Sequence, residues 1–292
     1  MAQQVPLWTI ESVVRWTTDD FRTRGLDNPR LDAELLLSHV LGTTRIQLIV
    51  DGKRPLAEDE LSRFRELVKR RRAREPMAYI VGQREFYGRT FRVDRRVLVP
   101  RPDTEALVEV ALARTRALSM SMRALDLCTG SGCVAITIAR ERPTISVTAT
   151  DVSADALAVA RDNAHRLGAY NVAFRQGDLF EAADSAGTRF DLVTANPPYV
   201  PSDEMASLMP DVRDFEPRLA LDGGPDGLAL LRRVVAGAPS RLGPGGILAV
   251  EVGAGEAPAV AQLLETAGLR AIEVARDYGR VERVVSGMLD VD

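Results

Sequence analysis

Apolar residues in the first part of the chain recur with the spacing of amphipathic helices. They lie three or four residues apart within residues 10–16, 31–40 and 61–67, and a glycine and a proline separate these groups. A period of 3.6 residues predicts helices whose apolar faces pack against one another, and glycine and proline are typical of helix ends. We therefore expect residues 1–75 to form a small helical domain.

A different pattern follows from Ala78 to Val99, where β-branched and aromatic residues are frequent and Gly88 lies in the middle. Such a run, interrupted by a turn residue, is typical of a β-hairpin. We expect residues 76–100 to form a hairpin linker that joins the helical domain to a second domain, residues 101–292.

Strand and helix patterns alternate through the second domain, and this order indicates an α/β fold with a parallel sheet covered by helices on both faces. The last two strands are separated only by Arg276–Arg280, which is too short for a crossover helix, so they should pair antiparallel. The expected strands are 124–127, 146–150, 172–175, 190–194, 246–252, 271–275 and 281–286, and the expected helices are 133–140, 154–167, 228–238 and 258–267.

Composition narrows the classes of function. The chain has 292 residues, a formal net charge of -3 and only 2 cysteines. These values do not favour a disulfide framework or a nucleic-acid binder that relies on bulk electrostatics, and no cluster of metal ligands is apparent. The sequence has no leader with a basic start and an apolar run, and no apolar stretch of about 18 residues. We therefore expect a cytoplasmic protein that does not bind membranes.

One basic segment, Lys69–Arg74, lies at the end of a predicted helix. Cations are favoured there by the helix dipole, so the first interpretation is a solvated helix end, and a surface that faces RNA or a partner is the alternative. The two tryptophans, Trp8 and Trp16, are expected to pack between helices of the first domain.

A glycine-rich turn joins the expected strand 124–127 to the expected helix 133–140. Gly130 and Gly132 let the backbone turn tightly and approach a ligand, and the helix N-terminus offers free N–H groups. The pattern Gly-x-Gly-x-x-Ala also satisfies the dinucleotide fingerprint. Asp126, four residues before the first glycine, adds an acid that can hold a cationic amino-acid ligand. We interpret the turn as a nucleoside-cofactor site.

Acids follow the next two expected strands. Asp151 ends one of them, and an acid about 20 residues after the glycine turn can accept both ribose hydroxyls of an adenosine. Asp178 and Leu179 follow the other strand. We expect Asp178 to accept from an adenine amino group and Leu179 to lie beside the ring.

The most specific motif is Asn196-Pro197-Pro198-Tyr199, directly after an apolar strand. Two consecutive prolines restrict the backbone and remove two N–H donors, so the Asn196 side-chain oxygen and the Pro197 carbonyl can face outward as paired acceptors. Such a pair fits a planar –NH2 group, and Tyr199 can cover the plane to which it is attached.

These motifs resemble those of class I methyltransferases that use S-adenosylmethionine, and Asn-Pro-Pro-Tyr resembles the motif of enzymes that methylate planar nitrogen. More narrowly, the chain is similar to the HemK/PrmC family of protein-glutamine methyltransferases, and the similarity covers nearly the whole chain. It implies a Rossmann-like sheet of seven mostly parallel strands, preceded by a small helical domain. The blocks that carry it are Glu75–Ile80, Arg84–Gly88, Val99–Glu105, Asn196–Tyr199 and Glu216–Gly227.

That family methylates the side-chain amide nitrogen of the glutamine in the Gly-Gly-Gln loop of bacterial peptide chain release factors. The resemblance therefore implies an enzyme that modulates translation termination, with S-adenosylmethionine as methyl donor and S-adenosylhomocysteine as product. It also implies release factors as protein partners, a helical domain that recognises them, a monomer, and no stable complex with nucleic acid.

The resemblance implies roles for individual residues. The expected catalytic residues are Asn196, Pro197 and Tyr199, and Pro198 is expected to bind the glutamine amide with them. Weaker candidates, which would shape the pocket, are Phe86, Arg101 and Glu105. The expected cofactor contacts are Asp126, Cys128, Thr129, Gly130, Ser131, Gly132, Asp151, Val152, Asp178, Leu179 and Asn196.

Two positions depart from the family pattern. Cys128 stands where a glycine is common, and Leu179 stands where an aromatic residue is frequent. Neither change removes a required polar contact, and the second is expected to weaken stacking on adenine. A nucleophilic role for Cys128 is not expected, because no general base is evident beside it.

Three other functions remain as alternatives. The enzymatic one is methylation of an exocyclic amine of a DNA or RNA base, which presents the same planar –NH2; the net charge and the family-specific blocks argue against it. A non-catalytic RNA or ribosome-associated module could use Arg70–Arg74, and a nicotinamide-dependent enzyme could use the glycine turn. Both of these leave Asn-Pro-Pro-Tyr unexplained.

Overall fold

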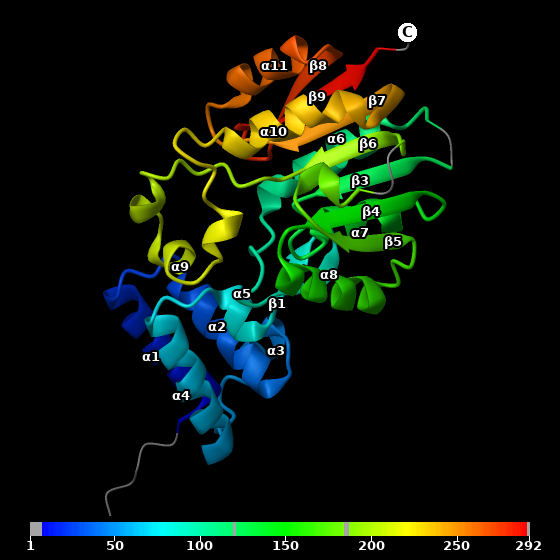
Figure 1. Ribbon diagram of the computed structural model, residues 1–292. Coiled ribbons are helices and arrows are strands. Elements are labelled where there is room, and N and C mark those ends of the chain that lie inside the picture. The colour runs from blue at the N-terminus through cyan, green and yellow to red at the C-terminus, as the bar shows by residue number, and fades with distance from the viewer. Residues whose placement is uncertain (1–7, 119–120, 184–186, 291–292) are drawn as a thin grey trace, which may run out of the picture. The chain divides into compact units, whose positions relative to one another are not determined.

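The protein divides into two compact units. The computed structural model describes residues 8–118, 121–183 and 187–290. A first unit ends at Gly82 and a second begins at Gln83, and each has its own hydrophobic core. Figure 1 shows the helices of the first unit in blue and cyan and the sheet of the second from green to red.

The first unit is helical, as its periodicity predicts. Thr9 and Ser12 form a capping box before the first helix, and the Thr44 hydroxyl accepts from the Gln47 N–H before the third; these bonds satisfy donors that a helix start leaves unpaired. Gly42 ends the second helix in the left-handed conformation. The described helices are α1 (Ile10–Thr23), α2 (Pro29–Leu41), α3 (Arg45–Val50), α4 (Glu58–Arg72) and α5 (Met77–Val81).

The basic run at the end of α4 is paired with acids of the same unit. Arg71 is buried, and its Nε donates to Asp32 Oδ2 at 2.7 Å. Arg72 donates to both carboxylate oxygens of Asp20 at 2.8 Å. The expectation of a solvated helix end is therefore wrong for these two arginines, because buried or half-buried acids from α1 and α2 take up their charge.

The two tryptophans lie together at the edge of this core. Their ring centroids are 6.2 Å apart in an edge-on arrangement, and Trp8 packs against the core cluster. Trp16 is 49% exposed, and the Arg72 guanidinium lies 5.4 Å from its ring centroid. The expectation that both tryptophans pack between helices therefore holds for Trp8, whereas about half of Trp16 is exposed to solvent.

The β-hairpin is shorter than expected and belongs to the second unit. Strands β1 (Gln83–Phe86) and β2 (Arg89–Arg92) pair antiparallel, whereas α5 occupies the start of the segment that we expected to be β. That part of the prediction was wrong because a five-residue apolar run has no readable period. Pro76 precedes the run and a left-handed Gly82 ends it, so the run closes as a short helix.

The hairpin is anchored in the second unit by its aromatic side chains. Phe86 and Phe91 are fully buried, with ring centroids 6.0 Å apart. The side-chain amide of Asn163 accepts from the Arg92 N–H at 2.7 Å and donates to the Arg92 carbonyl at 3.0 Å. The Asn163 amide thereby satisfies backbone groups of β2 that a neighbouring strand would otherwise pair with.

A seven-stranded sheet forms the centre of the second unit, in the order β5-β4-β3-β6-β7-β9-β8. The first five of these strands pair in parallel. Strand β9 is antiparallel to both β7 and β8, which confirms the pairing expected for the last two strands. The strands are β3 (Arg123–Leu127), β4 (Ser146–Asp151), β5 (Val172–Gln176), β6 (Phe190–Ala195), β7 (Leu242–Glu251), β8 (Leu269–Arg276) and β9 (Glu282–Leu289).

Helices cover both faces of the sheet. They are α6 (Glu105–Arg114), α7 (Cys133–Glu141), α8 (Ala154–Leu167), α10 (Ala229–Gly237) and α11 (Ala257–Thr266), and the short helices are η1 (Pro102–Thr104), η2 (Leu179–Glu181), η3 (Met205–Ser207), α9 (Pro210–Arg213), η4 (Arg218–Ala220) and η5 (Ala238–Ser240). No helix within the described ranges is long and apolar enough to cross a membrane.

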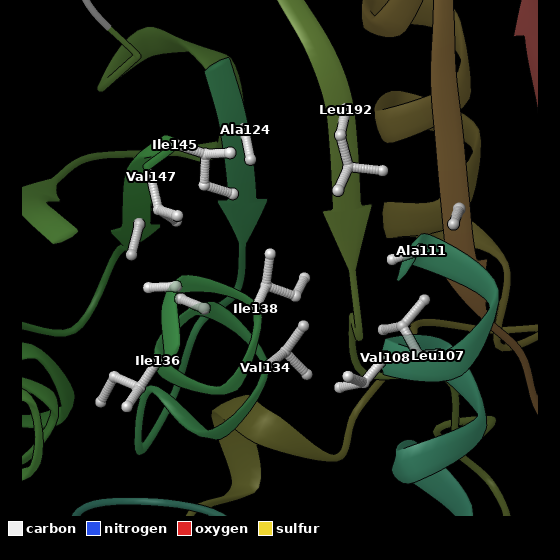
Figure 2. Close-up of a cluster of buried hydrophobic side chains, with 14 of the residues drawn as sticks. Leu107, Val108, Ala111, Ala124, Val134, Ile136, Ile138, Ile145, Val147 and Leu192 are labelled. Carbon is white, nitrogen blue, oxygen red and sulfur yellow. The ribbon is translucent and has the colours of Figure 1, made fainter. Parts of the chain in front are cut away.

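Successive side chains of the central strands enter different cores, as a period of two requires. Ala124 and Leu192 belong to the core that contains side chains of α6 and α7. Leu125 and Val193 belong to the core that contains side chains of α10 and α11. Figure 2 shows the first of these cores, with Leu107 among the side chains that α6 contributes.

The topology brings three predicted residues to one edge of the sheet. Strand β3 lies between β4 and β6 and is parallel to both, which makes the carboxyl ends of these strands a switch point where ligands bind in such folds. Asp126 lies near the end of β3, Asp151 ends β4 and Asn196 follows β6. The candidate site is therefore placed by strand order.

Candidate active site

A pocket at this edge contains most of the predicted site residues. Its cavity has a volume of about 140 Å³ and opens to solvent. The predicted residues that line it are Arg101, Asp126, Cys128, Thr129, Gly130, Ser131, Asp151, Val152, Asp178, Leu179, Asn196 and Pro198. Within the described part of the chain, the lining does not include Phe86, Glu105, Gly132, Pro197 or Tyr199.

The turn after β3 uses left-handed backbone at three positions. The φ angles are 56° at Cys128, 55° at Gly130 and 81° at Gly132. A Cβ on Gly132 would lie 2.7 Å from Ile136 Cδ1, whereas nothing lies within 4 Å of a Cβ placed on Gly130. Gly132 thus allows α7 to pack, and Gly130 leaves open space for a ligand. Cys128 has a side chain in a conformation that favours glycine, and its backbone is therefore strained.

Asp126 connects the turn to β6. Its side chain is buried, and its two oxygens accept from the Thr129 hydroxyl at 2.6 Å and the Thr194 hydroxyl at 2.7 Å. Burial raises the pKa of this carboxyl to about 6, although both hydroxyls favour its charged form. Because each carboxylate oxygen accepts more than one hydrogen bond, Asp126 can still face a cationic group in the pocket that it lines.

Asp151 connects the same turn to β4. One carboxylate oxygen accepts from the Gly130 N–H at 2.9 Å and the other from the Ser153 N–H at 2.9 Å. Burial is the largest cause of its raised pKa, and these N–H groups oppose it. Each oxygen keeps a second lone pair, so this carboxylate can accept from a pair of adjacent hydroxyls.

Asp178 and Leu179 line the pocket with partners that the sequence did not reveal. Asp178 Oδ2 accepts from Arg233 Nη2 at 2.7 Å on the surface. Leu179 has a φ of 48° and is 7% exposed, and it packs with the core on the α10 side of the sheet. An amino group that binds Asp178 would therefore share its carboxylate with Arg233.

The Asn-Pro-Pro-Tyr segment enters the pocket from the end of β6. Asn196 and Pro198 line the pocket, and Asn196 Nδ2 donates to Thr104 Oγ1 at 3.2 Å. This bond occupies the nitrogen side of the Asn196 amide and turns its oxygen away from Thr104. Burial raises the pKa of the Tyr199 phenol to about 12, so that the ring is neutral at ordinary pH.

A glycine in a second segment packs directly behind this motif. The Gly223 N–H donates to the Val200 carbonyl at 2.8 Å. A Cβ on Gly223 would lie 2.7 Å from Tyr199 Cα and 2.8 Å from the Pro198 carbonyl oxygen. Only a residue without a side chain fits there, which gives a physical reason for the glycines in the block 216–227.

Sequence reasoning missed three buried polar side chains beside the pocket. Thr104 is 2% exposed, Glu216 is 6% exposed and Glu251 is 1% exposed. Thr104 and Glu216 lie inside blocks of the family resemblance, and no role in the site was assigned to them; Thr104 was considered only as a possible helix cap. Glu251 had a readable signal, because it is an acid at the end of an apolar strand next to β6.

Phe86 and Glu105 support the hairpin instead of lining the pocket. Phe86 is buried in the core of the second unit, and Glu105 Oε1 accepts from the Tyr87 N–H at 2.8 Å. Among the described residues, neither side chain contacts the pocket directly, so the structure does not support the expectation that they shape it. Arg101, the third candidate, does line the pocket.

Both cysteines are free thiols at the base of the turn. Burial raises the pKa of Cys128 and raises that of Cys133 to about 12. A neutral thiol is a weak nucleophile, in line with the expectation that Cys128 is not a nucleophile. In the part of the chain that the structure describes, no group of three or more His, Cys, Asp or Glu side chains could hold a metal ion.

Comparison with known proteins also indicates an N-terminal domain followed by a methyltransferase domain. Residues 12–82 match the family model of the PrmC N-terminal domain, and residues 118–268 match that of a methyltransferase domain. A methyltransferase structure from Pyrococcus furiosus, with a TM-score of 0.51 and 18% identity, covers 70% of this chain and 91% of its own. At that identity the likeness concerns the fold alone.

Relatives with higher identity define the family. The release factor glutamine methyltransferase of Geobacter sulfurreducens is 42% identical over 289 residues, which is 99% of this chain and 100% of that protein. The protein of the same name from Bordetella pertussis is 46% identical over 261 residues, 89% of this chain and 95% of that protein. With a glycine turn, two acids and Asn-Pro-Pro-Tyr gathered at one switch point, the chain belongs to the release factor glutamine methyltransferase family.

Proposed function

We propose that this protein transfers the methyl group of S-adenosylmethionine to the side-chain amide nitrogen of the glutamine in the Gly-Gly-Gln loop of peptide chain release factors, with S-adenosylhomocysteine as the other product. Membership of the family supports the reaction. The single observation that carries it to named residues is that Asn196 lines the same pocket as Asp126 and Asp151.

The pocket residues fit the methyl donor chemically. Asp151 keeps lone pairs that would accept from two ribose hydroxyls, and Asp126 would hold the ammonium of the amino-acid part with a buried acid. Cys128–Gly132 would surround the methionine moiety, where Gly130 leaves open space. Asp178 and its neighbour Leu179 would lie near adenine. When bound, the sulfonium supplies an activated methyl group.

An amide nitrogen is a poor nucleophile because its lone pair is delocalised into the carbonyl. In the proposed mechanism, Asn196 Oδ1 and the Pro197 carbonyl accept the two N–H groups of the substrate amide and direct its lone pair toward the methyl group. The neutral ring of Tyr199, which adjoins the pocket-lining Pro198 without lining the pocket itself in the described part of the chain, would cover the amide plane. Proximity and preorganised dipoles supply the rate enhancement, and the proton leaves without a dedicated base.

The first unit has a separate role in this proposal. Its match to the PrmC N-terminal domain over residues 12–82 supports assigning release factor recognition to the helical unit and catalysis to the second unit. The pairing of Arg71 and Arg72 with acids supports a protein partner over stable nucleic-acid binding. The protein would act as a monomer in the cytoplasm, where release factors work.

A methyl-transfer assay with labelled cofactor tests the proposal. The acceptors, offered side by side, are a release factor, the same release factor with the Gly-Gly-Gln glutamine replaced by alanine, DNA and RNA. We expect label in the unmodified release factor only. Label that enters nucleic acid and not the release factor would overturn the proposal in favour of base methylation.

A further inference from the structure

A buried acid that the proposed reaction does not use lies behind Asn196. Strands β6 and β7 pair in parallel with Ala195 opposite Val250, so that Glu251 is the residue of β7 next in register with Asn196. The Glu251 side chain is 1% exposed and, among the described residues, is not part of the pocket lining. Any effect of Glu251 on the reaction must therefore pass through its neighbours.

Thr104, which lines the pocket, links this acid to Asn196. Its hydroxyl oxygen accepts from Asn196 Nδ2 at 3.2 Å, and its side chain makes no helix cap. A hydroxyl that accepts one hydrogen bond still has its own hydrogen to donate. The groups that favour the charged form of Glu251 include the Thr104 hydroxyl and the Asn196 amide, so Glu251 is the acceptor that this hydrogen faces.

The arrangement accounts for both hydrogens of the Asn196 amide. Thr104 accepts one at 3.2 Å. Glu251 is the acceptor available for the other, because the Asn196 amide is among the groups that favour its charged form and its Oε2 atom is buried with no other hydrogen-bond partner in the described part of the chain. Because both N–H groups of the Asn196 side chain point away from the pocket, its amide oxygen can point into the pocket. The opposite orientation would set an –NH2 of the enzyme against an –NH2 of the substrate and leave donors unpaired.

We propose that Glu251 and Thr104 are positioning residues that orient the Asn196 amide with its oxygen toward the acceptor nitrogen, a role that rests on the proposed function. Hydrogen bonds in such a chain polarise one another. Electron density from the Glu251 carboxylate therefore also strengthens Asn196 Oδ1 as an acceptor.

The charge on Glu251 depends on pH near neutrality. Burial raises its pKa to about 7; Arg283 on β9 favours the charged form and Asp103 on η1 opposes it. Tyr199 and Cys133 are further titratable groups among the described residues that interact with it. Below its pKa the acid carries a proton that competes for the Thr104 oxygen. Turnover should therefore rise with pH through about 7.

Four single variants test the proposal. They are Thr104→Val, Thr104→Ser, Glu251→Gln and the matched control Thr137→Val, which alters a buried threonine of α7 whose hydroxyl has no partner among the described residues. We expect Thr104→Val and Glu251→Gln to lower kcat at least about tenfold with an unchanged cofactor Kd. Thr104→Ser should retain activity, and Thr137→Val should match wild type.

Two further measurements separate positioning from a general loss of structure. In the pH profile of kcat, the rise through pH 7 should be absent in Glu251→Gln. Any change in the profile near pH 6 that comes from Asp126, whose pKa is about 6, should remain. In an Asn196→Ala background, Thr104→Val should cause no additional loss, because residues that act through one group are not additive. If Glu251→Gln fails to fold, the comparison of Thr104→Val with Thr104→Ser carries the test.

The possible failures are distinguishable. Additive losses in the Asn196→Ala background, or losses in Thr104→Val and Glu251→Gln no larger than in Thr137→Val, would overturn the positioning role while wild type still methylates the release factor. A wild-type protein that binds cofactor and leaves the release factor unlabelled would overturn the proposed function. The positioning role could then be read from the Asn196 side-chain –NH2 protons, whose exchange protection should be lost in Glu251→Gln.

Discussion

Arg101 and Glu216, which are 115 positions apart in the chain, form an ion pair at the rim of the pocket. Arg101 Nη2 donates to Glu216 Oε1 at 2.6 Å, and the other carboxylate oxygen accepts from the Val99 N–H at 3.1 Å. The Glu216 side chain is 1% exposed. The family blocks 99–105 and 216–227 are thus in direct contact through Glu216. This contact holds the pocket-lining segment around Arg101 in place.

Removal of this acid should cost both stability and cofactor affinity. In Glu216→Ala the Val99 N–H and the Arg101 guanidinium lose their acceptor, and we expect unfolding to become easier by about 1–3 kcal/mol. Cofactor binding should weaken because Arg101 lines the pocket. Urea unfolding and a cofactor titration measure the two effects.

The exposed ion pair between Arg213 and Asp214 provides the matched control. Ion pairs in water contribute little to stability, so Asp214→Ala should leave both quantities unchanged. Equal effects of Glu216→Ala and Asp214→Ala would contradict a special role for the buried pair.

Gly223 should affect turnover through the position of the catalytic segment. In Gly223→Ala the new Cβ would lie 2.7 Å from Tyr199 Cα and 2.5 Å from the Gly227 carbonyl, so backbone must shift. Because a displacement of about 1 Å can cost about 100-fold in rate, we expect kcat to fall far more than cofactor affinity. Gly243→Ala, whose Cβ would find its nearest neighbour at 3.8 Å, should retain wild-type kcat; a similar loss there would refute the explanation.

Asp126 should make stability depend on pH. Its pKa is about 6 in the folded protein, above its ordinary value of 3.8, so between these values the folded state binds the proton more tightly than the unfolded chain does. Stability therefore falls as pH rises from 3.8 to about 6 and stays lower above that, by about 3 kcal/mol.

Asp126→Asn removes the buried charge and can keep hydrogen bonds to both threonine hydroxyls. We expect this variant to be more stable than wild type at pH 8, to lose that advantage below pH 4, and to bind cofactor more weakly. Thermal unfolding across pH measures the first two effects. An unchanged difference between the two proteins at pH 4 and pH 8 would rule out the assignment to Asp126.

Asn196→Ala should separate binding from chemistry. The substitution removes the acceptor proposed for the substrate amide while the acids that face the cofactor, Asp126 and Asp151, remain. Loss of one preorganised group of this kind costs about 100-fold to 1000-fold in kcat, and we expect such a loss with nearly intact cofactor affinity. Single-turnover methylation and a cofactor titration provide the two values, and substantial retained turnover would exclude the catalytic role.

Arg71 should contribute to the stability of the first unit and not to nucleic-acid binding. Arg71→Ala removes the guanidinium that pairs with the buried Asp32 carboxylate, and breaking a buried pair costs about 3–5 kcal/mol. Lys69→Ala, which removes an exposed pair with Glu66, should be neutral in chemical unfolding. RNA affinity that fell with Arg71→Ala in a protein of unchanged stability would reinstate the basic run as a binding surface.

Much of the fold was readable from the sequence because its signals are local. Short runs of strand-forming residues predicted β3 and β6, the period of 3.6 predicted α8, and the short spacer before β9 predicted its antiparallel pairing. One exception was α5, where five apolar residues are too few to show a period, and the helix depends on the residues that flank it.

The sequence by itself determined the chemistry of the site: the glycine turn, the acids at strand ends and the Asn-Pro-Pro-Tyr motif. Tertiary structure alone decided which buried polar groups meet. Asn196 bonds to Thr104 from 92 positions away, and Arg71 bonds to Asp32 from 39 positions away. The physical reason is that a buried polar group must find a partner wherever strand and helix ends come together in space, and no local pattern records that meeting.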